Sequence, residues 1–94
     1  MYIFKTASDL QNYLTFKNQR IGFVPTMGAL HQGHISLISA SKIENELTVC
    51  SIFVNPTQFN DPSDFEKYPI TVSKDIDMLT AAGTDVLFLP SVKE

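Results

Sequence analysis

Two histidines, His31 and His34, are the side chains whose type and spacing most directly suggest chemistry in this sequence. Gln32 and Gly33 separate them, and a helix is predicted to begin at Gly33. Side chains three residues apart share one face of a helix, so both imidazoles can point to the same place. The N-terminus of a helix adds unpaired backbone N–H groups and the positive end of the helix dipole, which attract an anion. The arrangement predicts a site for a phosphate group.

The nearby glycines favour the same interpretation. Gly28 and Gly33 carry no Cβ atom, so a phosphate could approach the main chain closely. Two imidazoles and backbone donors would stabilise the charge that develops on a phosphoryl or nucleotidyl group during transfer. Zinc is the competing interpretation, but it needs a third ligand, and Cys50 falls within a predicted strand. The sequence contains neither a P-loop nor a GxGxxG motif.

Length and composition limit the class of protein. A chain of 94 residues allows one domain, and a hydrophobic content of 44% excludes a disordered chain. A net charge of −3 with scattered basic residues argues against nucleic-acid binding. The sequence shows no membrane-spanning apolar run, no signal peptide, and a single cysteine, which cannot form an internal disulfide. We expect a soluble, cytoplasmic protein without nucleic-acid or membrane partners.

The pattern of apolar residues predicts alternating helices and strands. The predicted helices span residues 6 to about 17, 33 to about 45, and 71–82. The predicted strands span residues 20–24, 47–54 and 85–89. Strands that alternate with helices in this way form a βαβαβ unit, so the predicted fold class is α/β with a Rossmann-like open parallel sheet.

Single residues mark the ends of these elements. Ser8 is the predicted N-cap of the first helix, and Pro25 is predicted to end the first strand. Asp75 and Asp77 fall in the early part of the third predicted helix, where the helix dipole favours negative charge, and Gly83 ends it. The strand at 47–54 is almost continuously apolar, which is typical of a strand buried on both faces.

Ligands of open α/β sheets bind beyond the carboxyl ends of the strands. The first predicted strand leads into residues 25–34, and the second leads into residues 55–59, within a loop that runs to residue 63. Both segments are rich in Gly, Pro, His, Asn and Gln. We therefore expect a binding site where these two loops meet at one edge of the sheet.

The run GFVPTMGALHQGH at 22–34 resembles the signature of the pantothenate synthetase (pantoate–β-alanine ligase) family, which belongs to the HxGH nucleotidyltransferase superfamily. FVNPTQF at 53–59 is similar to the family's second motif, and DFEKYP at 64–69 is similar to its third. The likeness covers essentially the whole chain. HxGH alone would indicate only the superfamily, whereas the extended run followed by NPTQF is specific for the family.

The resemblance implies an ATP-dependent condensation of pantoate with β-alanine to pantothenate. The reaction proceeds through pantoyl adenylate and releases AMP and pyrophosphate. Magnesium accompanies ATP as substrate, no residue is a metal ligand, and the family enzyme is usually a homodimer. His34, the family's proton donor, and His31 would be catalytic. ATP would be held by Met27, Gly28, Ala29, Leu30, His31, Gln32, Gly33 and His34. Pantoate and β-alanine would be bound by Gln58, with Pro25, Thr26 and Asn55 around pantoate.

The residues themselves leave some of these roles open. The amide of Gln58 both donates and accepts hydrogen bonds, so it could bind the hydroxyl groups and carboxylate of a hydroxy acid. It could equally cap its own loop. Cys50 is most simply an inert buried thiol. Ile70 follows Tyr68 and Pro69 where family members commonly have arginine.

The family's chain is longer than this one. Its later segments include a lysine-containing ATP loop, a second pantoate-binding glutamine and a Ser/Met-rich phosphate motif, none of which occurs in these residues. We expect residues 1–94 to form one Rossmann-like segment, the incomplete N-terminal part of such a ligase, with little activity alone. Two alternatives remain: another HxGH nucleotidyltransferase, and a non-catalytic segment that binds ATP or pantoate.

Overall fold

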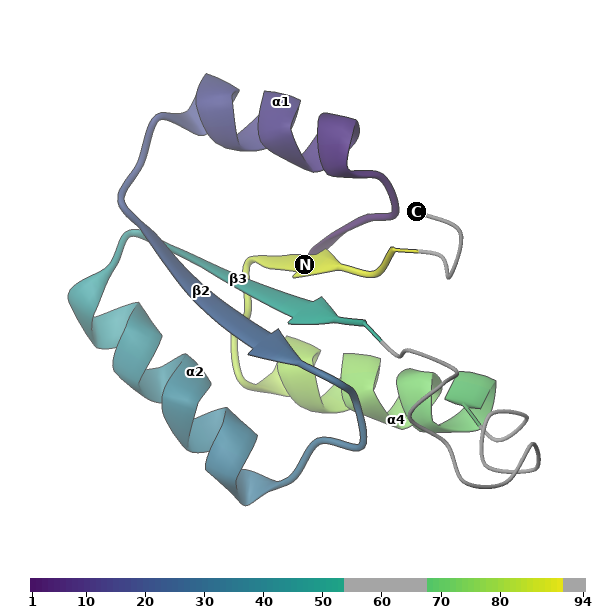
Figure 1. Ribbon diagram of the computed structural model, residues 1–94. Helices are drawn as coiled ribbons and strands as arrows, with labels where there is room; N and C mark the ends of the chain where they lie inside the picture. Colours follow the sequence, from purple (N-terminus) through teal and green to yellow (C-terminus); the bar gives the residue numbers. More distant parts are fainter. Residues whose placement is uncertain (54–67, 91–94) are drawn as a thin grey trace.

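The computed structural model describes residues 1–53 and 68–90. Within them, strands and helices alternate along the chain (Figure 1). The strands are β1 (Tyr2–Phe4), β2 (Ile21–Thr26), β3 (Leu47–Ile52) and β4 (Val86–Phe88), and the helices are α1 (Ala7–Lys17), α2 (Gln32–Glu44) and α4 (Tyr68–Ala81). The strands form one sheet in the order β1-β4-β3-β2, and each neighbouring pair is parallel. The predicted α/β class with a Rossmann-like parallel sheet is confirmed.

β3 lies inside the sheet, between β2 and β4, and all six of its residues are buried. Helix α1 covers one face of the sheet, and α2 and α4 lie on the other face (Figure 1). Because neighbouring side chains of a strand point to opposite faces, β3 must be apolar along almost its whole length. The prediction of a strand buried on both faces is confirmed.

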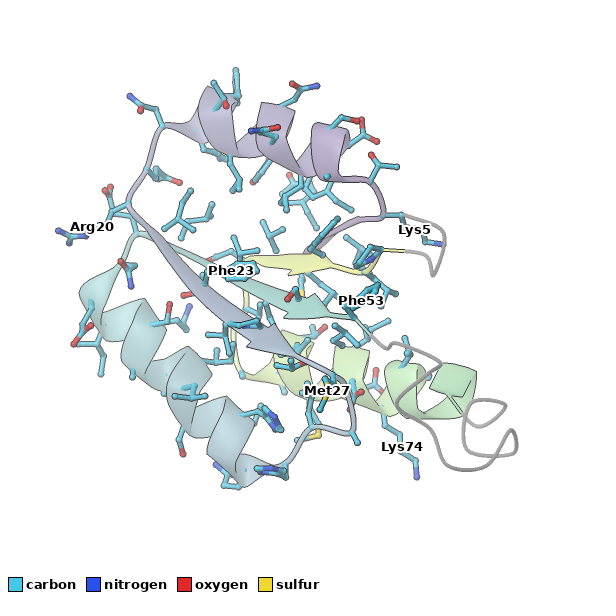
Figure 2. The ribbon with its side chains drawn as sticks, in the orientation of Figure 1. Lys5, Arg20, Phe23, Met27, Phe53 and Lys74 are labelled. Atoms are coloured by element: carbon cyan, nitrogen blue, oxygen red, sulfur yellow. The ribbon has the colours of Figure 1, made fainter. Side chains whose placement is uncertain are left out.

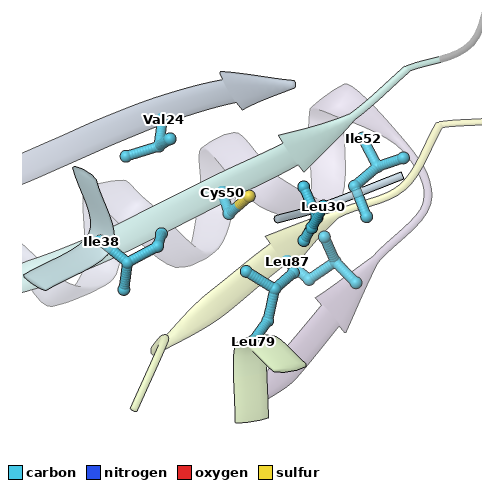
Figure 3. Packing of buried hydrophobic residues seen from close by; sticks show 7 residues of the cluster. All are labelled: Val24, Leu30, Ile38, Cys50, Ile52, Leu79 and Leu87. Atoms are coloured by element: carbon cyan, nitrogen blue, oxygen red, sulfur yellow. The ribbon is translucent and has the colours of Figure 1, made fainter. Parts of the chain in front are cut away.

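Two hydrophobic clusters fill the spaces between the sheet and its helices. The cluster between the sheet and helices α2 and α4 joins side chains from six different parts of the chain (Figure 3). Its buried members are Val24, Leu30, Ile38, Cys50, Ile52, Leu79 and Leu87. The second cluster, under α1, contains Leu47, Val49 and Val86, with Phe4, Leu10, Tyr13 and Leu14 packed against it. Leu30 is the member that ties a ligand-side loop into the core.

Strand β1 is missing from the predicted elements. Tyr2 pairs with Val86 and Phe4 pairs with Phe88, so β1 forms an edge of the sheet beside β4. A strand of three residues is too short to show a reliable alternation of apolar and polar side chains. The sheet therefore has four strands in the described residues, where the sequence predicts three.

Several predicted boundaries are wrong by a few residues. β2 runs through Pro25 to Thr26, which is possible because an edge strand tolerates a residue without an N–H group. Helix α1 is capped by Thr6, whose Oγ1 accepts the Asp9 N–H at 3.2 Å, and Ser8 lies within the helix. The third predicted helix begins at Tyr68, so Asp75 and Asp77 lie beyond its early turns.

Gly83 ends α4 as predicted. Its φ angle is 83°, in the left-handed region that glycine adopts without strain. The Gly83 N–H donates to the Thr80 carbonyl and the Thr84 N–H donates to the Leu79 carbonyl, each at 3.1 Å. These two bonds form a Schellman motif, which turns the chain toward β4. In the described residues, no helix is both long and apolar enough to cross a membrane.

Candidate functional site

The loop between β2 and α2 begins at the carboxyl end of β2, where the sequence predicts the ligand edge. Thr26 fixes its start, because Oγ1 donates to the Ser51 carbonyl at 2.9 Å and accepts the Gly28 N–H at 3.2 Å. Gly28 and Ala29 then adopt left-handed conformations, with φ angles of 89° and 52°. A left-handed conformation costs a residue with a Cβ atom roughly 1–2 kcal/mol, so other contacts must hold Ala29 in place.

Asp75 supplies those contacts from α4. Its Oδ2 accepts the Ala29 N–H and its Oδ1 accepts the Leu30 N–H, each at 2.9 Å. The Asp75 side chain is only 2% exposed. Successive N–H groups around a left-handed residue converge into a concavity that holds an anion. In this structure the anionic group is the carboxylate of the chain itself.

The sequence interpretation missed this role of Asp75. It placed the residue near the start of a helix, as a partner of the helix dipole. A signal was available, because Asp75 precedes Leu79 by four residues and therefore shares the buried face of α4. A carboxylate on a buried helix face needs hydrogen-bond partners. The sequence could reveal that need, but the identity of the partners depends on the tertiary fold.

The expected unpaired backbone N–H groups around the histidines are largely absent. Six N–H groups of this loop and of the first turn of α2 already have acceptors within the protein. They belong to Gly28, Ala29, Leu30, His31, Gly33 and His34. This part of the prediction is wrong, because the loop uses these donors to fix its own shape.

His31 and His34 cap the helix that follows them. His31 is the N-cap of α2, and its Nδ1 accepts the Gly33 N–H at 3.0 Å. The Nδ1 atom of His34 accepts the His31 N–H at 3.1 Å, which completes a reciprocal capping box. The ring centroids lie 4.2 Å apart, so the two imidazoles do share one place, as their spacing predicts.

This capping assigns the protons of the two rings. When Nδ1 of a neutral imidazole accepts a hydrogen bond, the ring carries its proton on Nε2. Neither Nε2 atom of His31 or His34 has a hydrogen-bond partner among residues 1–53 and 72–90. The pair therefore offers two N–H donors, held by their capping bonds, to a ligand at the carboxyl end of β2.

The other candidate residues differ in what their side chains can do. Met27 is 64% exposed and lies in the loop that follows β2 (Figure 2). Gln32 and Pro25 are also exposed. Leu30 is 9% exposed and packs in the core, so its side chain is not available to a nucleotide. Asn55 and Gln58 lie outside the described residues, as does the predicted loop that contains them.

Gly33 leaves space for the imidazole of His31. A Cβ atom at position 33 would lie 2.8 Å from Cε1 and 3.0 Å from Nδ1 of His31. Contacts this short require a shift of the ring, and therefore of the cap. The absence of a side chain at Gly33 therefore makes space for the His31 ring. The sequence interpretation had assigned this space to a phosphate.

Cys50 lies beneath the site in β3 and is 1% exposed. Burial raises the pKa of its thiol to about 11, the nearby Asp75 charge adds to this rise, and a hydrogen bond with Thr26 opposes it. The thiol therefore stays protonated near neutral pH and is not a nucleophile. The prediction of a buried thiol is confirmed. In the described part of the chain, no group of three or more His, Cys, Asp and Glu side chains is arranged to hold a metal ion.

Comparisons with known proteins agree with the predicted resemblance. A family model described as pantoate-beta-alanine ligase matches residues 2–94. A pantothenate synthetase of Cytophaga hutchinsonii is 60% identical over 78 residues, which are 83% of this chain and 28% of that protein. The pantothenate synthetase of Francisella tularensis subsp. novicida is 54% identical over 90 residues, which are 96% of this chain and 34% of that protein.

Solved structures share the fold. A Francisella tularensis pantoate-beta-alanine ligase, complexed with beta-gamma ATP and beta-alanine, superimposes with a TM-score of 0.82 at 50% identity, over 99% of this chain and 36% of that one. The Thermus thermophilus pantothenate synthetase gives a TM-score of 0.82 at 41% identity, over 100% of this chain and 33% of that one. The chain thus spans about a third of the length of these relatives. By sequence and by fold, the chain belongs to the pantoate–β-alanine ligase family.

Proposed function

We propose that this chain holds ATP and pantoate in a pantoate–β-alanine ligase, where pantoate is adenylated before β-alanine displaces AMP. The observation that carries the proposal is the histidine pair at the carboxyl end of β2, whose Nε2 atoms have no hydrogen-bond partner in the described part of the chain. Family membership supplies the reaction, because a Rossmann-like sheet alone hosts many activities.

In the first step, a carboxylate oxygen of pantoate attacks the α-phosphorus of ATP. An acyl–phosphate bond forms, the bond between the α-phosphorus and the bridging oxygen breaks, and pyrophosphate leaves. Negative charge increases on the phosphate oxygens during this transfer. His31 and His34 donate their Nε2–H groups to those oxygens. Because the capping box fixes both rings before ATP binds, little reorganisation is needed when the charge develops.

In the second step, the amine of β-alanine attacks the acyl carbon of the adenylate. A carbon–nitrogen bond forms, AMP leaves with the bridging oxygen, and the amine loses a proton to solvent. Pro25 and Thr26 line the side of the site at the end of β2. Gln58 binds pantoate and then β-alanine through an amide that both donates and accepts, and Asn55 contributes to the pantoate pocket.

Magnesium enters this proposal as part of the substrate. Mg²⁺ commonly binds the phosphates of ATP and keeps several of its waters, so it does not require a cage of protein ligands. We also propose a cytoplasmic location and a homodimer for the complete enzyme. The free, buried thiol of Cys50 supports a reducing compartment, because disulfides form mainly in oxidising ones.

The proposal is tested by grafting. This chain replaces the matching third of the Francisella tularensis ligase, and pantothenate formation from pantoate, β-alanine and ATP is measured. We expect turnover by the fusion and little turnover by the 94-residue chain alone. A folded fusion that makes no pantothenate, beside an active parent enzyme, contradicts the proposal. Calorimetric titration of the chain with a non-hydrolysable ATP analogue adds a second readout. Substitutions of His31 and His34 are compared with Ser39→Ala, a matched control on the exposed side of α2.

A further inference from the structure

The carboxylate of Asp75 connects α4 with the loop that leads into the histidine pair. Its two oxygens accept the N–H groups of Ala29 and Leu30, one each, at 2.9 Å. The bonded residues are 45 and 46 positions apart in the sequence. This contact therefore links two elements on the same face of the sheet, independently of the hydrogen bonds within the sheet.

The loop needs such a restraint because of its backbone. Gly28 and Ala29 are consecutive left-handed residues, and Ala29 adopts this conformation with a Cβ atom present. Thr26 holds the start of the loop, and Leu30 anchors its end by inserting into the core. Between these two points, the Ala29 main chain is held by the Oδ2 atom of Asp75.

His31 follows Leu30 directly, so the position of the loop fixes the position of the N-cap of α2. His34 in turn bonds to the His31 N–H, and both rings depend on where that N–H lies. We infer that Asp75 is a positioning residue for the ligase reaction: by clamping the Ala29 and Leu30 N–H groups it sets the place of the His31–His34 pair relative to the sheet edge. The catalytic part of this inference rests on the proposed function, and its geometric part does not.

Asparagine at position 75 keeps the size of the side chain but removes its charge and one of its two oxygen acceptors. An amide offers one oxygen acceptor, and its NH₂ group would face the second N–H donor. Asp75→Asn therefore breaks one bond of the clamp and places two donors against each other. Asp77→Asn is the matched control, because it makes the same chemical change on the same helix at an exposed side chain.

The first measurement uses the chain itself and needs no activity. The nitrogen NMR signals of the His31 and His34 rings report on their tautomers and on the bonds of Nδ1. We expect Asp75→Asn to move both sets of signals and to speed exchange of the Ala29 and Leu30 amide protons. Asp77→Asn should change neither. Faster amide exchange with unmoved ring signals overturns the inference, because the clamp would then stabilise the loop without positioning the histidines.

The second measurement is the kinetics of the fusion with the Francisella tularensis ligase. We expect Asp75→Asn to lower kcat per folded molecule about 100-fold, as small displacements of catalytic groups do, with a smaller change in the KM for ATP. Asp77→Asn should stay within about twofold of the parent. An unchanged kcat with only a lower Tm assigns Asp75 to stability and overturns the inference. If the unsubstituted fusion is inactive while the ring signals respond to Asp75→Asn, the proposed function fails and the positioning stands.

Discussion

His34 accepts the backbone N–H of His31 through Nδ1 at 3.1 Å, while Nδ1 of His31 accepts the N–H of Gly33. The two residues that stand nearest to the proposed chemistry are therefore also the two that begin helix α2. In each ring, Nδ1 accepts the hydrogen bond that caps the helix, and Nε2 is available to a ligand. Substitutions that keep the cap and remove the Nε2–H donor can separate these roles.

The first prediction concerns His34. His34→Ala should lower adenylate formation about 10²–10³-fold, as loss of one preorganised donor does. Loss of the cap should also reduce the free energy of unfolding by about 0.5–2 kcal/mol. His34→Glu should keep the stability, because glutamate at this position completes a capping box, and should still lose the activity, because an ionised carboxylate has no N–H donor. The measurements are urea denaturation and single-turnover adenylation. If His34→Glu is fully active, the Nε2–H of His34 is not the donor.

The second prediction concerns Gly33. Alanine favours a helix over glycine by roughly 1 kcal/mol, yet we expect Gly33→Ala to destabilise the protein. The reason is the 2.8 Å contact that the new Cβ would make with Cε1 of His31. In a His31→Ser background, where serine still caps the helix, Gly33→Ala should be neutral or stabilising. The free energies of unfolding of the four proteins form a double-mutant cycle. An equal effect in both backgrounds would place the cause elsewhere.

Local patterns were sufficient to predict much of this molecule. The apolar run of β3 predicts burial on both faces, and the three-residue spacing of His31 and His34 predicts that their rings meet. Gly83 marks a helix end by a conformation that few other residues adopt. Each of these signals depends on neighbours within a few positions, so the sequence contains them directly.

The remaining features depend on residues far away in the sequence, or on a choice between two nearby residues that suit the same role. Asp75 pairs with main-chain groups more than forty residues away, and no local pattern shows which N–H groups those are. Thr6 and Ser8 are both good N-caps, and only the geometry of the chain selects Thr6. β1 is a strand because it pairs with β4. The sequence of its three residues does not indicate this pairing.

The third prediction concerns Cys50 and pH. The pKa of its thiol lies at about 11 in the folded chain, above the value of 9.0 for a free thiol. Between these values the unfolded chain loses the proton while the folded chain keeps it, so stability falls as pH rises. The total loss should be roughly 2–3 kcal/mol. Cys50→Ala should flatten this part of the curve of unfolding free energy against pH. An identical slope in the variant would show that other groups cause the decline.

The last prediction concerns Gln58, which distinguishes a pantoate ligase from a general nucleotidyltransferase. Gln58→Glu keeps the size of the side chain but replaces its donor with a negative charge. If this side chain binds pantoate, the variant loses a hydrogen bond and repels the carboxylate of the substrate. An unpaired buried polar group costs roughly 1–3 kcal/mol, which corresponds to about a 5- to 150-fold loss of affinity.

We therefore expect Gln58→Glu to weaken pantoate binding far more than binding of an ATP analogue. Gln58→Ala should have a milder effect on pantoate, because it removes the hydrogen bond without adding charge. Calorimetric titration of the parent and both variants with each ligand makes the comparison. A glutamine that only capped its own loop would give neither difference. Equal losses for both ligands, or an unchanged affinity for pantoate, would therefore remove Gln58 from the pantoate site.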